Sequence, residues 1–150
     1  MRSVSFEELP SLVGQEIGAS DWVAIEQDRI NMFANATGDH QWIHIDIERA
    51  KKELPGGKTI AHGYLTLSLM PMLAAGIMRV TGVSRGINYG SNKVRFINMV
   101  PVGSKVRGRQ KLLSAEPKSG GMQLISEFTV EIEGQDRPAL IAETIGLVYR

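Results

Sequence analysis

Cysteine is absent from this 150-residue sequence, which excludes disulfides, thiolate nucleophiles and zinc-finger frameworks. A surplus of charge is lacking as well, since 17 Lys and Arg residues against 16 Asp and Glu residues leave a net charge of +1. That balance gives no electrostatic argument for a nucleic-acid partner or for an anionic membrane surface. Because a chain without cysteine suits a reducing compartment, we expect a cytoplasmic protein.

Long hydrophobic runs are also missing. The longest, residues 64–77, contains Thr66, Ser68 and Pro71 and falls short of the roughly 20 residues that span a bilayer. Residues 1–9 are too acidic and too weakly apolar for a signal peptide. The composition, 43% hydrophobic and 22% charged, is ordinary for a soluble globular chain. We therefore expect no membrane segment and a single domain over residues 1–150.

The first half of the chain is predicted to hold helices and loops. Residues 20–25 have the pattern of a short strand, residues 27–36 of a helix, and residues 46–52 of a second helix with Asp46 as its N-cap. Gly38 supplies a stop after the first helix, and residues 55–57 (Pro-Gly-Gly) are a break. The inner stripe of the first helix is predicted to be Ile30, Phe33, Ala34 and Thr37.

The second half is predicted to hold one buried helix and four strands. Residues 64–80 are apolar on nearly every side, so this helix should be surrounded by protein, with a local kink at Pro71. Alternating β-branched and aromatic residues predict strands over 87–96, 105–115, 122–133 and 139–149. Helices first and strands afterwards indicate an α+β domain whose single antiparallel sheet wraps around the buried helix.

Titratable side chains gather in the loop after the first helix, in the run from Thr37 to His44. Asp39 and His44 stand five residues apart, and together they are able to hold a water molecule and exchange its proton near neutral pH. Adding water across a conjugated double bond, or removing it, needs such an acid–base pair. It also needs a donor for the neighbouring carbonyl oxygen, on which charge develops.

A second motif, His62-Gly63, stands where the buried helix is predicted to begin. The first backbone N–H groups of a helix have no intrahelical partner, and glycine lets a substrate carbonyl approach them closely. Gly63 is therefore a candidate donor to the oxyanion, provided that it lies in the first turn. His62 is assigned a supporting role beside it in substrate binding, and holding the loop is its alternative role.

The same residues also have purely structural interpretations. Asp39 is equally suited to capping the segment that follows it, and His44 to being a partly buried histidine with satisfied hydrogen bonds. His40 is expected to be exposed, and Trp42 to pack the loop. Spacing alone does not choose between these interpretations and the acid–base site.

The segments 33–44 (Phe-Ala-Asn-Ala-Thr-Gly-Asp-His-Gln-Trp-Ile-His), with Ala50, and 60–69 resemble the two conserved blocks of MaoC-like dehydratases, which include the (R)-specific enoyl-CoA hydratases. Segments 88–96 and 101–103 are also similar to that family. The resemblance covers roughly residues 15–149 and is closest to the nodulation-protein-N-like branch. It implies a hot-dog fold, a place in fatty-acid metabolism, and a homodimer whose two sheets join edge to edge.

Carried over by position, the resemblance makes Asp39 and His44 the catalytic pair and Gly63 the backbone donor to the thioester carbonyl. The implied reaction is reversible hydration of a trans-2-enoyl-CoA to the (R)-3-hydroxyacyl-CoA, with no metal and no cofactor besides the coenzyme A of the substrate. The sequence departs from the family where Gln41-Trp42 replaces the usual Asn-Pro. That change concerns the geometry of the loop and leaves the Asp/His pair intact.

Coenzyme A carries phosphates, which require local cations. Lys93 and Arg95 alternate with apolar residues on one strand and are the preferred pair, while Lys105, Arg107 and Arg109 form a similar stripe on the next strand. Both stripes also fit a solvated outer face of the sheet.

Two other functions fit the same features. The first is an acyl-CoA thioesterase, in which the water attacks the carbonyl carbon. The second is a non-catalytic, acyl-thioester-binding subunit of a dehydratase, although the intact Asp/His motif argues against that role.

Overall fold

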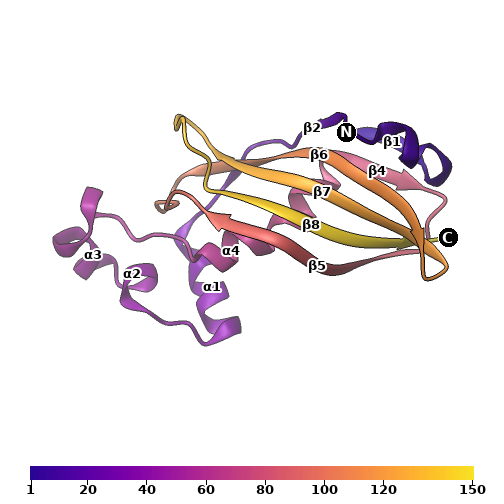
Figure 1. Cartoon of the computed structure of the whole chain (residues 1–150). Coiled ribbons are helices and arrows are strands. Elements are labelled where there is room, and N and C mark those ends of the chain that lie inside the picture. Colours follow the sequence, from indigo (N-terminus) through magenta and orange to yellow (C-terminus); the bar gives the residue numbers. More distant parts are fainter.

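Four long antiparallel strands make up most of the main sheet in the computed structural model, which describes all 150 residues (Figure 1). Their order is β6-β7-β8-β5, and the short strands β2 and β3 pair with the free side of β6. Residues on β6 and β7 alternate between buried and partly exposed, because only one face of the sheet covers the core. The strands are β2 (Glu16–Ala19), β3 (Val23–Ala24), β5 (Arg85–Phe96), β6 (Lys105–Lys118), β7 (Gly121–Ile132) and β8 (Leu140–Tyr149).

The helices of the first half lie together at one end of the sheet (Figure 1). They are α1 (Gln27–Thr37), α2 (Trp42–Ile45) and α3 (Ile47–Glu53), followed by the 3-10 helix η2 (Pro55–Gly57). The 3-10 helix η1 (Phe6–Leu12) precedes them in the sequence and lies at the other end, beside β1 (Arg2–Ser5) (Figure 1). The predicted stop is confirmed, since Gly38 ends α1 in the left-handed region at φ 80°. The predicted cap is confirmed too, because Asp46 Oδ1 accepts a hydrogen bond from Arg49 N–H at 3.0 Å. Thr37, however, is exposed and does not belong to the buried stripe of α1.

The helix predicted over 64–80 is shorter and is broken in two, so that prediction is wrong at its C-terminal end. It consists of α4 (Gly63–Ser68) and α5 (Met70–Ala75), interrupted at Leu69 close to the helix-disrupting Pro71. The chain then forms β4 (Met78–Thr81), which pairs in parallel with β1 (Arg2–Ser5). Short apolar runs suit a helix and a strand equally, and here the N-terminal segment supplies a partner strand.

Two further details differ from the sequence prediction. A two-stranded parallel sheet, β1 with β4, accompanies the main antiparallel sheet, so the sheet is not single. The strand predicted over 20–25 is reduced to the two residues of β3, while β1 and β2 were not predicted. These strands have two to four residues each, too few to show a recognisable alternation.

The core lies between the sheet and the segment α4–α5. It contains 22 buried hydrophobic residues, among them Leu73 of α5 and Val106, Leu112 and Val130 of the sheet. Helix α5 lies so close to β6 that a side-chain carbon on Gly108 would stand 3.0 Å from Leu73 Cβ. None of the helices has both the length and the apolar character that crossing a membrane requires. Not all of α4–α5 is enclosed, because Tyr64 and Met72 are exposed in the single chain.

Candidate active site

The loop between α1 and α2 carries Asp39 and α2 carries His44, and both lie close to His62, the residue before α4. Gly38 redirects the chain after α1, and Asp39 Oδ1 then accepts a hydrogen bond from the Gln41 N–H at 3.3 Å. Asp39 is exposed, whereas His44, on the short helix α2, is buried. The structure therefore brings together a carboxylate in contact with solvent and an imidazole inside the fold.

The hydrogen bond of His44 fixes its tautomer. Its Nδ1 lies 2.7 Å from the carbonyl oxygen of Ile60, which can only accept, so Nδ1 carries the proton and donates it. The other ring nitrogen, Nε2, is then an unprotonated acceptor. A histidine held in this form is prepared to take a proton from water.

His62 supports the ring of His44 from behind. The two rings are stacked with centroids 3.8 Å apart, and the tilted ring of Phe33 lies 4.9 Å from that of His62. His62 Nε2 donates a hydrogen bond to the Asp39 carbonyl oxygen at 3.0 Å, while its Nδ1 is buried without a partner. One side chain thus holds both members of the pair in place, the Asp39 backbone by a hydrogen bond and the His44 ring by stacking.

Asp39, His44 and His62 are also close enough to share a small ligand. One oxygen or nitrogen atom from each lies within 4.8 Å of the corresponding atoms of the other two. A carboxylate and two imidazoles suit either a water molecule or a metal ion. Because His44 Nδ1 and His62 Nε2 are already used in hydrogen bonds to carbonyls, only His44 Nε2, His62 Nδ1 and the carboxylate are free for that ligand.

Burial lowers the pKa of His44 below its ordinary value of 6.5. Loss of water around the ring is the largest cause, and His62 adds to the effect, whereas the hydrogen bond to Ile60 and the charge of Asp39 oppose it. The ring is therefore neutral at pH 7, as a proton acceptor must be.

His44 and Gly63 line the same cavity, which has a volume of about 460 Å³. Gly63 is the first residue of α4, so its N–H has no partner within the helix, and it makes no other hydrogen bond. A side-chain carbon on this residue would stand 3.0 Å from the ring of Phe96, a tight contact that glycine avoids. The condition that Gly63 lies in the first turn is met, and nine of the thirteen lining residues are hydrophobic.

Two residues that the sequence analysis did not single out hold His44 in place. Gln27, at the start of α1, donates from Nε2 to the His44 carbonyl oxygen at 2.8 Å. Its Oε1 accepts a hydrogen bond from the hydroxyl of Thr59 at 2.5 Å, and Thr59 is almost fully buried. No sequence signal identifies this pair, because the two residues are 32 positions apart and meet only in the folded chain.

Lys93 and Arg95 do not line this cavity. Both are exposed on β5, and Phe96, the neighbour of Arg95, does line it. Because successive side chains on a strand point to opposite faces, Arg95 faces away from the cavity. Of the candidate cations on β5, neither is in contact with the site in the single chain.

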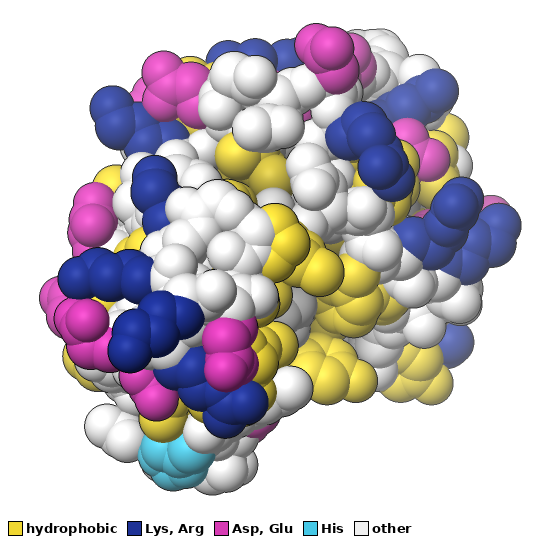
Figure 2. Space-filling view, turned by 90° about the vertical axis from the view of Figure 1, so that its left-hand side faces the viewer, with side chains coloured by type: hydrophobic (Ala, Val, Ile, Leu, Met, Phe, Trp, Pro, Cys, Tyr) yellow, Lys and Arg dark blue, Asp and Glu magenta, His cyan; other side chains and the backbone are white.

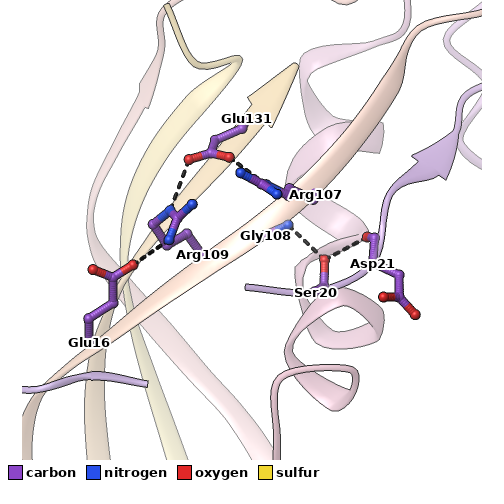
Figure 3. Close-up of polar contacts among 7 residues, drawn as sticks. All are labelled: Glu16, Ser20, Asp21, Arg107, Gly108, Arg109 and Glu131. Carbon is purple, nitrogen blue, oxygen red and sulfur yellow. Dashed lines mark hydrogen bonds and ion pairs between the residues drawn. The ribbon is translucent and has the colours of Figure 1, made fainter. Parts of the chain in front are cut away.

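The second stripe of cations belongs to an ion-pair network on the outer face of the sheet (Figure 3). Arg107 and Arg109 both bind the carboxylate of Glu131, at 2.6 and 2.9 Å, and Arg109 also binds Glu16 at 2.6 Å. Between them Gly108 faces the other way, toward α5, and its N–H donates to Ser20 Oγ at 2.9 Å. For these two arginines the interpretation as a solvated outer face is confirmed.

The remaining residues of the loop have structural contacts. His40 is exposed and lies 3.1 Å from Asn35 Oδ1. Trp42, which replaces the family's usual proline, begins α2 and packs beneath the guanidinium of Arg49 at 3.9 Å.

On the face of the molecule shown in Figure 2, hydrophobic side chains gather in and beside a hollow, with Lys and Arg side chains around it.

Comparisons with solved structures define the class of fold. The chain is similar to the R-hydratase PhaJ1 from Pseudomonas aeruginosa in the unliganded form, with a TM-score of 0.75, 22% identity, and 92% of this chain and 82% of that chain covered. It is also similar to the (R)-hydratase from A. caviae involved in PHA biosynthesis, with a TM-score of 0.72, 20% identity, and 89% and 94% covered. The predicted hot-dog fold is therefore confirmed.

The sequence comparisons then identify the family. The family model described as "MaoC like domain" matches residues 8–130. A relative named 3-hydroxyacyl-thioester dehydratase Z, from Mycobacterium tuberculosis, is 50% identical over 142 residues, which are 94% of this chain and 93% of the relative. Nodulation protein N from Rhizobium leguminosarum bv. viciae is 45% identical over 150 residues, 99% and 93% of the two chains. The chain belongs to the MaoC-like dehydratases, and it is an enzyme of the dehydratase/hydratase type.

Proposed function

We propose that the protein catalyses the reversible hydration of a trans-2-enoyl-CoA to the (R)-3-hydroxyacyl-CoA. The observation that carries this proposal is the common cavity of His44 and Gly63, next to the carboxylate of Asp39. The reaction needs a proton acceptor for the attacking water and a hydrogen-bond donor for the thioester oxygen. The unprotonated Nε2 of His44 and the free N–H of Gly63 are these two groups. The names of the relatives given above support an acyl-thioester substrate.

In the hydration direction, Asp39 and His44 hold one water molecule. The water oxygen bonds to the β-carbon, its proton passes to His44 Nε2, and the electrons of the double bond move onto the thioester oxygen. The Gly63 N–H stabilises the negative charge on that oxygen. The Asp39–His44 pair then returns a proton to the α-carbon, so that one water has been added in total. No step requires a metal ion or a redox cofactor, and dialysis against a chelator should leave the rate unchanged.

Hydration of crotonyl-CoA by wild type, Asp39→Asn and His44→Gln tests the proposal. General acid–base groups contribute roughly 10²- to 10⁴-fold, so each variant should lose activity on that scale. The matched controls are His40→Gln and Asp136→Asn, both exposed and outside the cavity, which should retain the wild-type rate. Near-wild-type rates of the two site variants, with intact folding, would show that the site is wrongly assigned.

A thiol reagent separates hydration from the thioesterase alternative. Hydration conserves the thioester, whereas hydrolysis releases free coenzyme A. The position of Gly63 is compatible with both reactions, and the Asp/His pair favours hydration. If free thiol appears at the rate at which the enoyl absorbance disappears, the thioesterase replaces the hydratase as the function.

We further propose a homodimer joined along β5, in the cytoplasm where the composition led us to expect the chain. All twelve residues of this edge strand are exposed, among them Ile87, Val94 and Phe96. A long, hydrophobic, unpaired edge favours association with another strand. Light scattering during gel filtration should give twice the chain mass for wild type, the monomer mass for Ile87→Lys, and a dimer for the control Val13→Lys, which is exposed elsewhere. A monomeric wild type would contradict the dimer.

A further inference from the structure

A second cavity, of about 490 Å³, lies between the segment α4–α5 and the inner face of the sheet. The two cavities share no lining residue but follow one another along the helix, since Thr66 lines the first and Leu67 and Ser68 line the second. Only seven of its sixteen lining residues are hydrophobic, and none of the sixteen is Asp, Glu, Lys, Arg or His. The cavity therefore suits an uncharged ligand that is partly apolar and carries a polar group.

A row of polar side chains crosses the sheet inside this cavity. In the strand register Ser91 of β5 pairs with Thr144 of β8, and Thr144 pairs with Ser126 of β7. Gln110 of β6 continues the row, because its Nε2 donates to Ser126 Oγ at 3.1 Å. The inner face of a sheet that covers a helix is normally apolar, so a row of hydroxyl and amide groups there is unusual.

The buried end of the row leaves one hydrogen-bonding position open. Gln110 and Ser126 are 6% and 4% exposed, and Gln110 Oε1 has no hydrogen-bond partner. An unpartnered buried polar atom costs about 1–3 kcal/mol of stability. The partly buried amide of Gln27, by comparison, uses both its oxygen and its nitrogen in hydrogen bonds. The contrast indicates that the open position on Gln110 belongs to a ligand.

We propose that this second cavity binds the distal part of the acyl group, and that Gln110 with Ser126 selects an acyl group carrying a hydroxyl. The inference rests on the proposed hydration of acyl-CoA, in which the thioester lies at Gly63. Of the two arms of such a substrate, the acyl arm is uncharged over its whole length, whereas the coenzyme A arm is uncharged only in its pantetheine part and ends in phosphates, for which the second cavity offers no cation. We therefore place the acyl arm along α4, with its distal part in the second cavity.

A hydroxyl is the group that meets the geometry of the pair. It donates to Gln110 Oε1 and accepts from the Ser126 hydroxyl, and it satisfies the amide in either orientation because it is both donor and acceptor. A ketone lacks the donor, and an ammonium group would be buried without a counter-charge. An unsubstituted acyl chain would leave Gln110 without a partner and is therefore the disfavoured substrate.

The test compares medium-chain trans-2-enoyl-CoA substrates with and without one hydroxyl, placed in turn at each distal carbon. At one position the wild type should prefer the hydroxylated substrate by about tenfold in kcat/KM, the equivalent of one buried hydrogen bond. The double variant Gln110→Met/Ser126→Ala should lose this preference. The matched control, Gln123→Met, removes a glutamine of β7 that lines neither cavity, and it should keep the preference.

Binding measurements keep this inference distinct from the proposed reaction. Calorimetric titration with the saturated acyl-CoA pair, which cannot be hydrated, should show the same tenfold preference and its loss in the double variant. A wild type that hydrates enoyl-CoA without preferring a hydroxyl at any position overturns the inference and leaves the reaction standing. A wild type that prefers the hydroxylated saturated ligand but hydrates nothing overturns the reaction and leaves the binding site standing. A preference that survives in the double variant overturns the role of Gln110 and Ser126.

Discussion

The two cavities along α4 and α5 differ in how their polar groups are used. In the first, His44 is fixed by a bond to the Ile60 carbonyl and presents a single free nitrogen among mostly hydrophobic neighbours. In the second, six polar side chains stand beside seven hydrophobic ones, no charge is present, and Gln110 keeps an unused oxygen. Catalysis needs one defined protonation state, which existing hydrogen bonds supply, whereas recognition needs a hydrogen bond that only the ligand completes.

Among the changes compared here, Gly63→Ala in the first cavity should reduce the rate of hydration the most. The added carbon would meet the Phe96 ring at 3.0 Å and stand where the substrate carbonyl approaches the backbone. A displacement of about 1 Å at a reacting group costs on the order of 10²-fold, so kcat/KM for crotonyl-CoA should fall by about that factor. The melting temperature should change little, since alanine favours a helix over glycine. Full activity in Gly63→Ala would contradict the close approach of the carbonyl to this residue.

The second prediction is that the rate of hydration depends on pH, whereas the preference of the second cavity for a hydroxyl does not. Because burial lowers the pKa of His44 below 6.5, the ring stays an unprotonated base at neutral pH. Activity is therefore retained as the pH falls through 6.5 and is lost only below the lowered pKa, by about tenfold per pH unit. The preference for a hydroxylated acyl group should stay constant over the same range, since no Asp, Glu, Lys, Arg or His lines the second cavity. A kcat/KM profile of the substrate pair measures both quantities, and a preference that titrates would contradict the neutral cavity.

The lowered pKa of His44 also affects stability. Below about pH 6.5 the unfolded chain takes up the histidine proton more readily than the folded one does, so the free energy of unfolding decreases as the pH falls toward the lowered pKa. The acid loss of activity should therefore be measured where the protein is still folded, as judged by circular dichroism. His44→Gln should remove this contribution to the pH dependence of unfolding.

The sequence predicted the parts of this molecule that have long patterns or short-range motifs. The four long strands lie within a few residues of their predicted ends, because alternation over ten or more residues is unambiguous. Asp39, His44 and Gly63 are brought together as the order of elements indicated. Gln27 was not predictable, since its partners meet only in the folded chain. Gln110 was recognisable from the sequence, because the alternation of β6 places it on the same buried face as Val106 and Leu112, where an apolar residue is expected.

Gln27, which is partly buried, and Gln110, which is buried, should respond oppositely to replacement. Gln27→Met leaves the Thr59 hydroxyl and the His44 carbonyl without their partner, which should cost about 1–3 kcal/mol in the free energy of unfolding. Gln110→Met/Ser126→Ala removes a pair that already has an unsatisfied atom, so its stability should equal or exceed that of wild type. Urea denaturation of the three proteins checks this. A double variant as destabilised as Gln27→Met would assign the pair on β6 and β7 to folding instead of recognition.

The smallest effect concerns the cations proposed for coenzyme A. Lys93 and Arg95 are exposed and form no ion pair, whereas Arg107 and Arg109 are engaged by Glu131 and Glu16. If the free pair binds phosphate, Lys93→Ala/Arg95→Ala should raise KM for crotonyl-CoA several-fold without changing kcat, and added salt should diminish the difference. The control Arg107→Gln should leave KM unchanged, because that arginine lies in the ion-pair network of the outer face (Figure 3). An unchanged KM in the double variant would leave β5 with its proposed role in the dimer alone, and would direct the search for phosphate ligands to the residues around the mouth of the first cavity.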